Sequence, residues 1–466
     1  MTTTVLGIDS STQATKALLV DAATGEVLEE RRAAHPDGTE VDPRAWLAAA
    51  DEAAGPLLER AEAVAVGGQQ HGMVLLDAHG EVVRDALLWN DTRSAPQAEA
   101  LIEEMGGPEA SVAEIGSLMV ASFTASKLRW VRDEEPQNAD RAASVLLPHD
   151  YVSRHLAGGG EAFTDRGDAS GTAYYSTASE QWKPELVELA LGHGLELPRL
   201  PGSPQEIMAR TPGGAAIAAG TGDNMGAALG LSLGEGDVSV SIGTSGVCAM
   251  VSPVRPNDAS GTVTGFADAT GRFLPMTTTI NAARILEAGR ALLGVDWDEF
   301  AALALASVPG AHGVTLLPYF DGERTPNRPT ARATLTGMST ATTREDIARA
   351  YVEGLLCSLA DGIAALEERT GTAAARITVI GGAAKNRAVQ ELAPAVFGRE
   401  VTFAPPAEYV ALGAARQAAW ALAGTDEPPA WEISGSQVAG AEPTPGVLGA
   451  YRELKARTEG WGAAAS

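Results

Sequence analysis

One local pattern, a strand followed by a short polar turn and a second strand, occurs near the start of the chain and again near its middle. The first copy has an apolar run at residues 5–9, a turn at 10–15 and a second strand at 16–21. The second copy spans residues 237–250 and carries Gly243 and Thr244 in its turn. Turns of small and hydroxyl-bearing residues are typical of hairpins. The repeat predicts two structurally related units, with the boundary near residues 233–236.

The length of the chain agrees with two units. Its 466 residues are too many for one ordinary core, and two domains of roughly 200 residues each are expected. Helical segments alternate with short β-rich runs, which is typical of an α/β protein. We expect a first domain at 1–233, a second domain at 234–446, and a tail helix within 447–466 that returns to the first domain.

Two segments that follow the first hairpin can be assigned from their spacing. Residues 42–61 have the periodicity of a helix, and the Gly55–Pro56 pair is expected to interrupt it. Residues 63–67 are predicted to form a buried strand that ends at a glycine.

The composition argues against several classes of protein. A net charge of −26 opposes binding to nucleic acid or to anionic membranes. No run of about 18 apolar residues is present, and the N-terminus lacks the basic and apolar segments of a secretory signal. The two cysteines, Cys248 and Cys357, lie in apolar surroundings and predict neither a disulfide framework nor a metal cluster. We expect a cytoplasmic protein.

The first hairpin turn combines an acid, hydroxyl side chains and a lysine. Asp9 ends the first strand, Thr12 lies in the turn, and Lys16 begins the second strand. An acid at this place can hold a hydrated cation, while the amides of the turn and the lysine can meet phosphate oxygens. The alternative is an ordinary hairpin with a surface lysine, and the P-loop pattern is absent.

A second acid precedes a helical run in the first unit. Asp223 and Asn224 follow a glycine and lie directly before the run at residues 225–231. Asp223 is either a simple helix N-cap or a carboxylate that accepts a proton from an attacking hydroxyl. The helix dipole would help to keep it ionised.

A polar cluster follows the predicted strand at 63–67. Gln70 and His71 lie between glycines, an arrangement typical of the edge of a small-ligand site. The alternative is a structural histidine in a tight turn.

A glycine turn follows another apolar strand at residues 376–380. Gly382 would let the backbone pass close to a flat ring, and Asn386 can hydrogen-bond a base or a ribose. The alternative is a plain connection between a strand and a helix.

The order of these features resembles the FGGY family of carbohydrate kinases, which have the actin- and hexokinase-like ATPase fold. The resemblance covers nearly the whole chain. Residues 122–134 are similar to the first signature of the family, and residues 335–338 with 346–350 are similar to the second, where Tyr351 replaces a usually small residue. The resemblance implies an α/β protein of two ribonuclease H-like domains with a ligand cleft between them.

The resemblance also implies a role for each candidate residue. Asp223 would be the general base, and Asp9 would organise Mg²⁺ near the phosphates of ATP, through water. The other contacts divide between ATP and the sugar: Thr12, Lys16, Gly243 and Thr244 at the phosphates, Gly382 and Asn386 at the adenosine, and Gln70, His71, Asp223 and Asn224 at the sugar.

Within the family, several stretches are similar to the xylulokinases. They lie at residues 69–72, 75–77, 88–93, 147–151, 164–172 and 317–326. Xylulokinases commonly have methionine where this chain has Gln70, so the preferred pentulose is the least determined feature. The resemblance implies ATP-dependent phosphorylation of D-xylulose at its C5 hydroxyl.

Three alternatives stay open. A kinase for another polyol or ketose, such as ribulose, gluconate or glycerol, would use the same scaffold. A non-catalytic sugar or ATP sensor would keep the fold without turnover, although Asp9 and Asp223 are both present. An actin-like polymer would not need the sugar-side cluster. Members of the family are often dimers, so a homodimer is one expectation for this chain.

Overall fold

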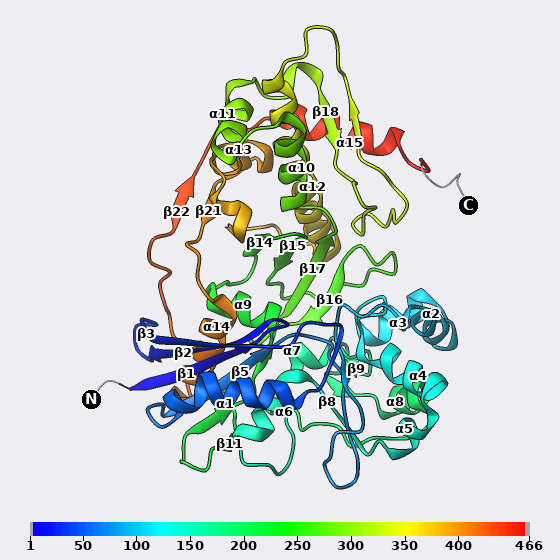
Figure 1. Cartoon of the computed structure of the whole chain (residues 1–466), viewed down its shortest axis with the longest axis vertical. Coiled ribbons are helices and arrows are strands. Elements are labelled where there is room, and N and C mark those ends of the chain that lie inside the picture. Colours follow the sequence, from blue (N-terminus) through cyan, green and yellow to red (C-terminus); the bar gives the residue numbers. More distant parts are fainter. Residues whose placement is uncertain (1–2, 462–466) are drawn as a thin grey trace.

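Two mixed β-sheets, each covered by helices, form the two lobes of the computed structural model, which describes residues 3–461 (Figure 1). The first sheet has the strand order β11-β12-β5-β1-β2-β3, and β13 also pairs with β5. Its strands are β1 (Thr4–Ser10), β2 (Ala14–Asp21), β3 (Val27–Ala34), β5 (Ala63–Gly68), β11 (Ile207–Arg210), β12 (Ala216–Ala218) and β13 (Thr221–Gly222).

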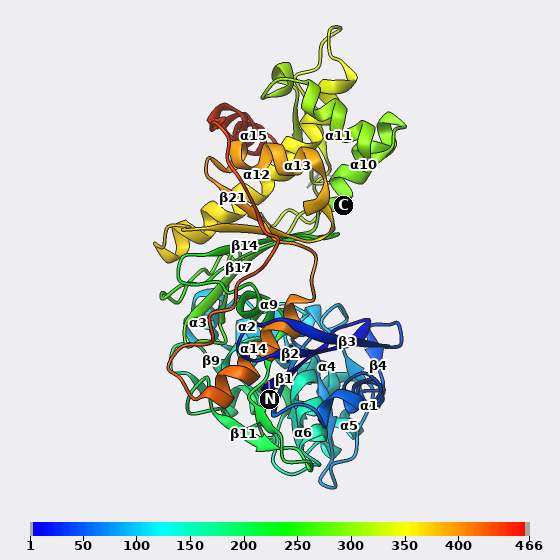
Figure 2. The ribbon, with the colours of Figure 1, turned by 90° about the vertical axis from the view of Figure 1, so that its left-hand side faces the viewer.

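The second sheet has the order β16-β17-β15-β14-β20-β21-β22. Its strands are β14 (Val238–Ile242), β15 (Gly246–Met250), β16 (Thr264–Ala267), β17 (Phe273–Thr279), β20 (Ile377–Ile380), β21 (Val401–Phe403) and β22 (Gln437–Ala439). Figure 2 shows the two lobes one above the other, and the chain passes between them after α9, before α14 and after α14.

The two sheets share one topology. In each, a central antiparallel hairpin (β1–β2 or β14–β15) has a parallel neighbour on one side (β5 or β20). A further parallel strand (β12 or β21) and an antiparallel edge strand (β11 or β22) follow on that side. The internal duplication predicted from the two hairpins is therefore present in the strand order and direction.

Helix α1 (Arg44–Leu58) packs against β1, β2 and β3 on one face of the first sheet. Its buried side chains recur at helical spacing, from Trp46 to Leu57. The predicted interruption at Gly55–Pro56 is wrong, because the helix continues through both residues. They lie on its exposed side, where water can satisfy the carbonyl that loses its amide partner at Pro56.

Helix α14 (Tyr409–Ala423) covers the opposite face of the first sheet, although it comes late in the sequence. It packs against β1, β5 and α9 (Asp223–Gly230) at very short range. A Cβ atom on Gly413 would clash with the carbonyl of Gly226, and one on Gly7 would clash with the carbonyl of Ala411. Gly7 lets α14 approach the backbone of β1, and Gly413 lets it approach the backbone of α9, which fixes the helix that begins at Asp223.

The prediction that the tail helix returns to the first domain is wrong for the described residues; residues 462–466 lie outside them. Helix α15 (Pro445–Arg457) packs against elements of the second lobe, and α14 is the element that returns. The reason is chemical: α15 buries Tyr451 against Tyr319, and its Arg452 pairs with Asp361, so its partners belong to the second lobe.

The second sheet packs on one face against α12 (Arg344–Thr370), which contacts β15 and β17. The other face meets the first lobe, where Phe266 and Met276 share a core with Met225 of α9. The remaining helices of this lobe are α10 (Ala283–Leu293), α11 (Trp297–Ala306) and α13 (Arg387–Phe397), with short 3₁₀ turns at Ala311–Gly313 and Gly382–Lys385.

The other helices of the first lobe are short: α2 (Ala95–Glu104), α3 (Pro108–Ile115), α4 (Thr124–Glu134), α5 (Pro136–Arg141), α6 (Pro148–Leu156), α7 (Arg166–Ala169) and α8 (Pro184–Leu191). Small strand pairs complete the fold: β4 (Glu40–Val41) with β7 (Ala86–Leu87), β6 (Val74–Leu76) with β8 (Ser144–Leu146), β9 (Tyr175–Ser176) with β10 (Gln181–Trp182), and β18 (Thr315–Leu317) with β19 (Thr334–Thr336). Over residues 3–461, every helix is too short or too polar to cross a membrane.

Candidate active site

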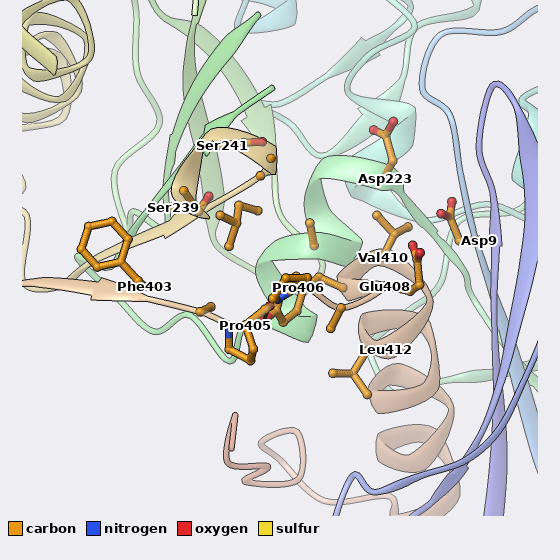
Figure 3. A pocket seen from close by; sticks show the side chains of 18 of the residues that line it. Asp9, Asp223, Ser239, Ser241, Phe403, Pro405, Pro406, Glu408, Val410 and Leu412 are labelled. Atoms are coloured by element: carbon orange, nitrogen blue, oxygen red, sulfur yellow. Dashed lines mark hydrogen bonds between the residues drawn. The ribbon is translucent and has the colours of Figure 1, made fainter. Parts of the chain in front are cut away.

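A cavity of about 1090 Å³ lies between the two lobes (Figure 3). The first sheet and α9 contribute polar side chains to its wall, among them Asp9, Lys16 and Asp223. The second lobe contributes Ser241 and the glycine turn that contains Gly382. The cavity therefore brings together one end of each duplicated hairpin.

Asp9 sits near the end of β1, directly opposite Lys16 of β2 in the strand register. Its carboxylate is buried, and the Ser11 hydroxyl and the Lys16 ammonium both approach Oδ2. Burial is the main cause that raises the pKa of Asp9 above its ordinary value. Oδ1 is buried without a hydrogen-bond partner among the described residues, which leaves one oxygen for a ligand.

Lys16 is held by an acid that the sequence did not suggest. Its Nζ lies 2.6 Å from Glu408 and 3.5 Å from Asp9. Burial alone would lower the pKa of Lys16, but the carboxylates of Glu408 and Asp9 outweigh it and raise the pKa. Glu408 precedes α14, so the helix that returns from the second lobe also supplies a charge to the first hairpin.

Asp223 is the first residue of α9, and Gly222 is the N-cap. The interpretation of Asp223 as the cap itself is therefore wrong. Its Oδ1 accepts hydrogen bonds from the backbone and side-chain amides of Asn224, each at 2.8 Å. Burial, then the negative charges of Asp9 and Asp168, raise the pKa of Asp223 to about 7.

His71 has a defined tautomer and a strained backbone. Its φ of 68° lies in the left-handed region, and its Nδ1 lies 2.7 Å from the carbonyl of Gly171. Because a carbonyl only accepts, Nδ1 carries the proton and Nε2 keeps a lone pair. Burial lowers the pKa of His71 to about 3, so the ring is neutral.

Lys127 holds the backbone of this histidine through a hydrogen bond. The buried Nζ donates to the carbonyls of His71 (3.1 Å) and Ser122. Burial lowers the pKa of Lys127 to about 7. No role was assigned to Lys127 from sequence, although it lies in the segment 122–134 that carries a family signature; the helix there is polar, so a lysine in it gave no signal of burial.

Gln70 and Asn224 lie next to each other at the edge of the first lobe. Gln70 is only 3% exposed, and its Oε1 accepts a hydrogen bond of 2.9 Å from Asn224 Nδ2. The predicted sugar-side residues Gln70, Asn224 and Asp223 are thus joined by hydrogen bonds.

Several predicted phosphate ligands do not line the cavity. Thr12 points toward the sugar-side cluster, where its hydroxyl donates to Gln69 and accepts from Trp89 Nε1 at 3.0 Å. Gly243 and Thr244 form the tip of the second hairpin, and their carbonyls accept from the amides that begin α10. The second tip is exposed at Thr244 and Ser245, whereas the hydroxyls of Ser11 and Thr12 in the first tip already have hydrogen-bond partners.

The two residues predicted at the adenosine differ from each other. Gly382 lines the cavity, and a Cβ added there would meet no atom within 4 Å. Asn386 caps α13 instead: its Oδ1 accepts from the amides of Ala388 (2.9 Å) and Val389 (3.3 Å). The Oδ1 atom thus serves the strand-to-helix connection, and the contact of Asn386 with a base stays a prediction.

Known proteins resemble the chain over almost its whole length. Residues 4–230 match the N-terminal domain and residues 238–422 the C-terminal domain of the FGGY family of carbohydrate kinases. The xylulose kinase of Streptomyces coelicolor is 44% identical over 437 residues, which cover 91% of this chain and 89% of that protein. The xylulose kinase of Escherichia coli is 32% identical over 440 residues, 89% of each protein.

A solved structure gives the same answer for the fold. The crystal structure of xylulose kinase from Bifidobacterium adolescentis has a TM-score of 0.93 and 47% sequence identity, with 97% of this chain and 99% of that chain covered. The predicted actin- and hexokinase-like architecture of two α/β domains is confirmed. With both family domains in order and an acidic cleft between the lobes, the chain belongs to the FGGY family of carbohydrate kinases.

Proposed function

We propose that the chain transfers the γ-phosphoryl group of ATP to the C5 hydroxyl of D-xylulose, with Asp223 as the general base. The relatives with 44% and 47% identity are xylulose kinases, and this supports the choice of sugar. The single observation that carries the mechanism is the position of Asp223, at the start of α9 on the wall of the interlobe cavity that also holds Asp9.

Asp223 has the properties that a general base needs. Its pKa of about 7 lies near the operating pH, so the carboxylate is ionised often enough to accept a proton and basic enough to hold it. The sugar hydroxyl, once oriented by Asp223, attacks the phosphoryl group in line, and the carboxylate takes its proton.

The groups around Asp223 suit a neutral polyhydroxylated substrate. Neutral His71 presents the lone pair of Nε2, since Nδ1 is held by Gly171. Asn224 uses its side-chain NH₂ group on Asp223 and Gln70, and its Oδ1 stays available. These acceptors match the hydroxyl donors of a ketopentose.

The nucleotide would lie along the second lobe, with its phosphates toward the first hairpin. Lys16 and the backbone amides near Thr12, Gly243 and Thr244 would meet the phosphate oxygens, and Gly382 would lie beside the adenosine. In a chain with a net charge of −26, such local donors are what an anionic ligand requires.

The residues fit a Mg²⁺ ion that arrives with ATP. Asp9 Oδ1 is a buried carboxylate oxygen with no partner in the described structure. Within residues 3–461 no cluster of three or more His, Cys, Asp or Glu side chains forms a metal cage. One or two carboxylates with water and phosphate oxygens are the usual Mg²⁺ environment. Asp9 would hold the hydrated ion, which neutralises charge on the phosphates when bound.

The proposal is tested by sugar-dependent release of ADP from Mg·ATP. The panel contains D-xylulose, D-ribulose, L-xylulose, L-ribulose, gluconate, glycerol and D-arabitol. Stimulation by D-xylulose above the others supports the proposal, and preference for another sugar replaces the substrate while it keeps the reaction. ATP binding without stimulation by any sugar would favour a sensor. The enzyme is expected in the cytoplasm, and light scattering tests the expected homodimer.

A further inference from the structure

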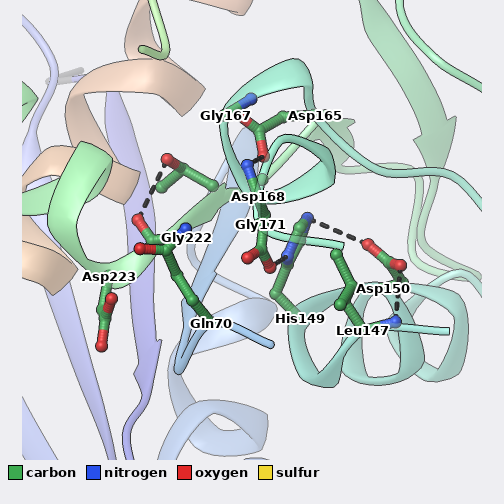
Figure 4. A network of polar contacts seen from close by, with 12 residues as sticks. Gln70, Leu147, His149, Asp150, Asp165, Gly167, Asp168, Gly171, Gly222 and Asp223 are labelled. Atoms are coloured by element: carbon green, nitrogen blue, oxygen red, sulfur yellow. Dashed lines mark hydrogen bonds and ion pairs between the residues drawn. The ribbon is translucent and has the colours of Figure 1, made fainter. Parts of the chain in front are cut away.

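Gln70 lies at the junction between the sugar side of the cleft and a buried group of acids (Figure 4). It follows β5 and packs on Gly222, where an added Cβ would come within 2.9 Å of Gln70 Cγ. The side chain is 3% exposed and therefore has little freedom to turn toward a ligand. Its amide is fixed by its protein neighbours.

The orientation of that amide follows from a chain of donors and acceptors. The carboxylate of Asp223 only accepts, so Asn224 must turn its NH₂ group toward it, at 2.8 Å. The same NH₂ group lies 2.9 Å from Gln70, so Gln70 must present its oxygen there. The NH₂ group of Gln70 is left on the opposite side, away from the sugar.

On that opposite side lies a buried acid with a free oxygen. Gln70 Nε2 and Asp168 Oδ1 are both buried, and neither has a hydrogen-bond partner within the described part of the chain. One is a donor and the other an acceptor. Asp168 Oδ2 is already occupied by His149 Nδ1 at 2.7 Å. A small adjustment would let the two unpaired groups satisfy each other, as buried polar groups generally do.

The group behind Gln70 is buried and consists of three ionisable side chains. His149 lies between two carboxylates: Nδ1 bonds Asp168, and Nε2 is 3.1 Å from Asp150 Oδ1. All three side chains are inaccessible to solvent. The backbone also packs closely on this residue, since a Cβ on Gly68 would come within 2.9 Å of His149 Cβ, and one on Gly220 within 2.5 Å of the His149 ring. A partner held in this way can fix the position of Gln70.

We propose that Gln70 is a positioning residue whose amide ties Asn224 to the buried Asp168–His149 pair and so fixes how Asn224 and Asp223 meet the sugar. Gln70 does not touch the sugar in this account. With both amide hydrogens of Asn224 in use, only its Oδ1 faces the substrate, and a sugar hydroxyl must be its partner. A methionine at this position could form neither bond. The inference rests on the proposed function.

A double-mutant cycle tests the link between Gln70 and Asn224. Gln70→Met should lower kcat/KM for D-xylulose by roughly tenfold, but only about twofold or less in an Asn224→Ala background, because its effect passes through Asn224. The matched control is Gln69→Met, a buried glutamine of the same turn bonded to Thr12 rather than Asn224; its effect should be the same in both backgrounds. An equal tenfold loss from Gln70→Met in both backgrounds would overturn the proposal and make Gln70 a direct sugar ligand.

An exchange of polarity tests the link between Gln70 and Asp168. Gln70→Glu keeps an acceptor for Asn224 but places two acceptors face to face, so kcat/KM should fall. Adding Asp168→Asn supplies a donor toward position 70 and keeps an acceptor for His149, so the double variant should recover at least about threefold over Gln70→Glu. No recovery, with both variants folded, would overturn the link.

The same cycles measured by urea unfolding separate this inference from the proposed function. Coupling between positions 70 and 224 in the unfolding midpoint is expected whether or not D-xylulose is the substrate. If no sugar stimulates the wild type, the proposed function fails, and the unfolding cycle still decides the link. Additive unfolding effects at 70 and 224 would overturn the inference even in an active kinase.

Discussion

The two central hairpins have the same topology but opposite chemistry. Asp9 and Ser241 occupy matching places, each next to the last residue of the inner strand, and both line the cavity. Across the hairpin, Asp9 faces Lys16, whereas Ser241 faces Val247. The matching positions of the two hairpins therefore present an ion pair on one side of the cleft and neutral side chains on the other.

This difference suggests a division of work between the lobes. The first lobe carries the acids that can hold a cation and accept a proton, Asp9 and Asp223. The second lobe offers serine hydroxyls, glycines, backbone amides and the side chain of Lys385, which can bind an anion without adding negative charge to a strongly acidic protein. A duplicated fold can thus separate chemistry from nucleotide binding by changing a few residues at equivalent positions.

The sharpest test of this division compares the kcat of the Asp9→Asn variant with that of the Ser241→Ala variant. Asp9→Asn should lower kcat by roughly 10²- to 10³-fold, because charge neutralisation near the phosphates is worth several kcal/mol. Ser241→Ala removes at most one neutral hydrogen bond and should cost about tenfold or less. Both are measured as D-xylulose-dependent ADP release at saturating Mg·ATP.

Equal losses in the two variants would contradict the division. Thermal unfolding of both proteins is the control, since Asp9 is a buried acid and its replacement is expected to leave the fold intact or more stable.

The pH dependence should be set by the acidic side alone. Asp223 must be ionised to accept a proton, and its pKa is raised to about 7 by burial, Asp9 and Asp168. Activity is therefore present above this pKa, and kcat/KM should fall about tenfold per unit as the pH drops below it. Asp168→Asn removes one of the two acids, so the fall of kcat/KM on the acidic side of the pH profile (the acidic limb) should move to lower pH. At pH 6, the kcat/KM of the variant, as a fraction of its value at high pH, should be a few-fold larger than that of the wild type.

The matched control for this shift is Asp150→Asn. Asp150 is equally buried, but it lies on the other side of His149 and is not among the acids that raise the pKa of Asp223. Its replacement should leave the acidic limb in place. A limb that stays unchanged in Asp168→Asn would mean that the Asp168 carboxyl is neutral in the working enzyme.

The smallest expected effect concerns a polar residue that follows one of the two matching parallel strands, β5 and β20. Gln70 follows β5 and connects to the cleft, whereas Asn386 follows β20 and caps α13. Asn386→Ala should lower the free energy of unfolding by about 1 kcal/mol. The KM for ATP should change less than twofold, because the loss of a helix cap disturbs the nucleotide side of the cleft only slightly. A tenfold rise in this KM at unchanged stability would restore Asn386 as a nucleotide ligand.

The duplicated α/β fold could be predicted from the sequence, because the features that indicate it can be read from residues that are neighbours in the chain. The hairpins, the buried strand β5 and the acid at the start of α9 all follow from strand periodicity, turns and small residues. The pattern did not predict that α1 passes through Pro56, because that depends on the helix side that faces water. Nor did it predict that α14 rather than α15 returns to the first sheet, which depends on backbone contacts of Gly413 and Gly226.

The position of several candidate residues on the cavity wall could be predicted, because they lie at the ends of strands or at the start of a helix. Asp9, Lys16, Asp223 and Gly382 do line the cavity. Glu408, Lys127 and the His149–Asp168 pair were not assigned, because each acquires its role from a partner distant in the sequence. Asn386 caps α13 through its Oδ1, and its contact with the nucleotide stays a prediction.

The most direct measurement is D-xylulose-dependent ADP release by Asp223→Asn beside the wild type. The substitution keeps the size of the side chain and removes the proton acceptor, so kcat should fall by about 10²- to 10⁴-fold. Calorimetry of ATP and sugar binding and a thermal melt show whether the variant is folded and loaded. A folded variant that binds both ligands and has lost turnover is the predicted result. Near-normal turnover in a folded variant would contradict the assignment of Asp223 as the base.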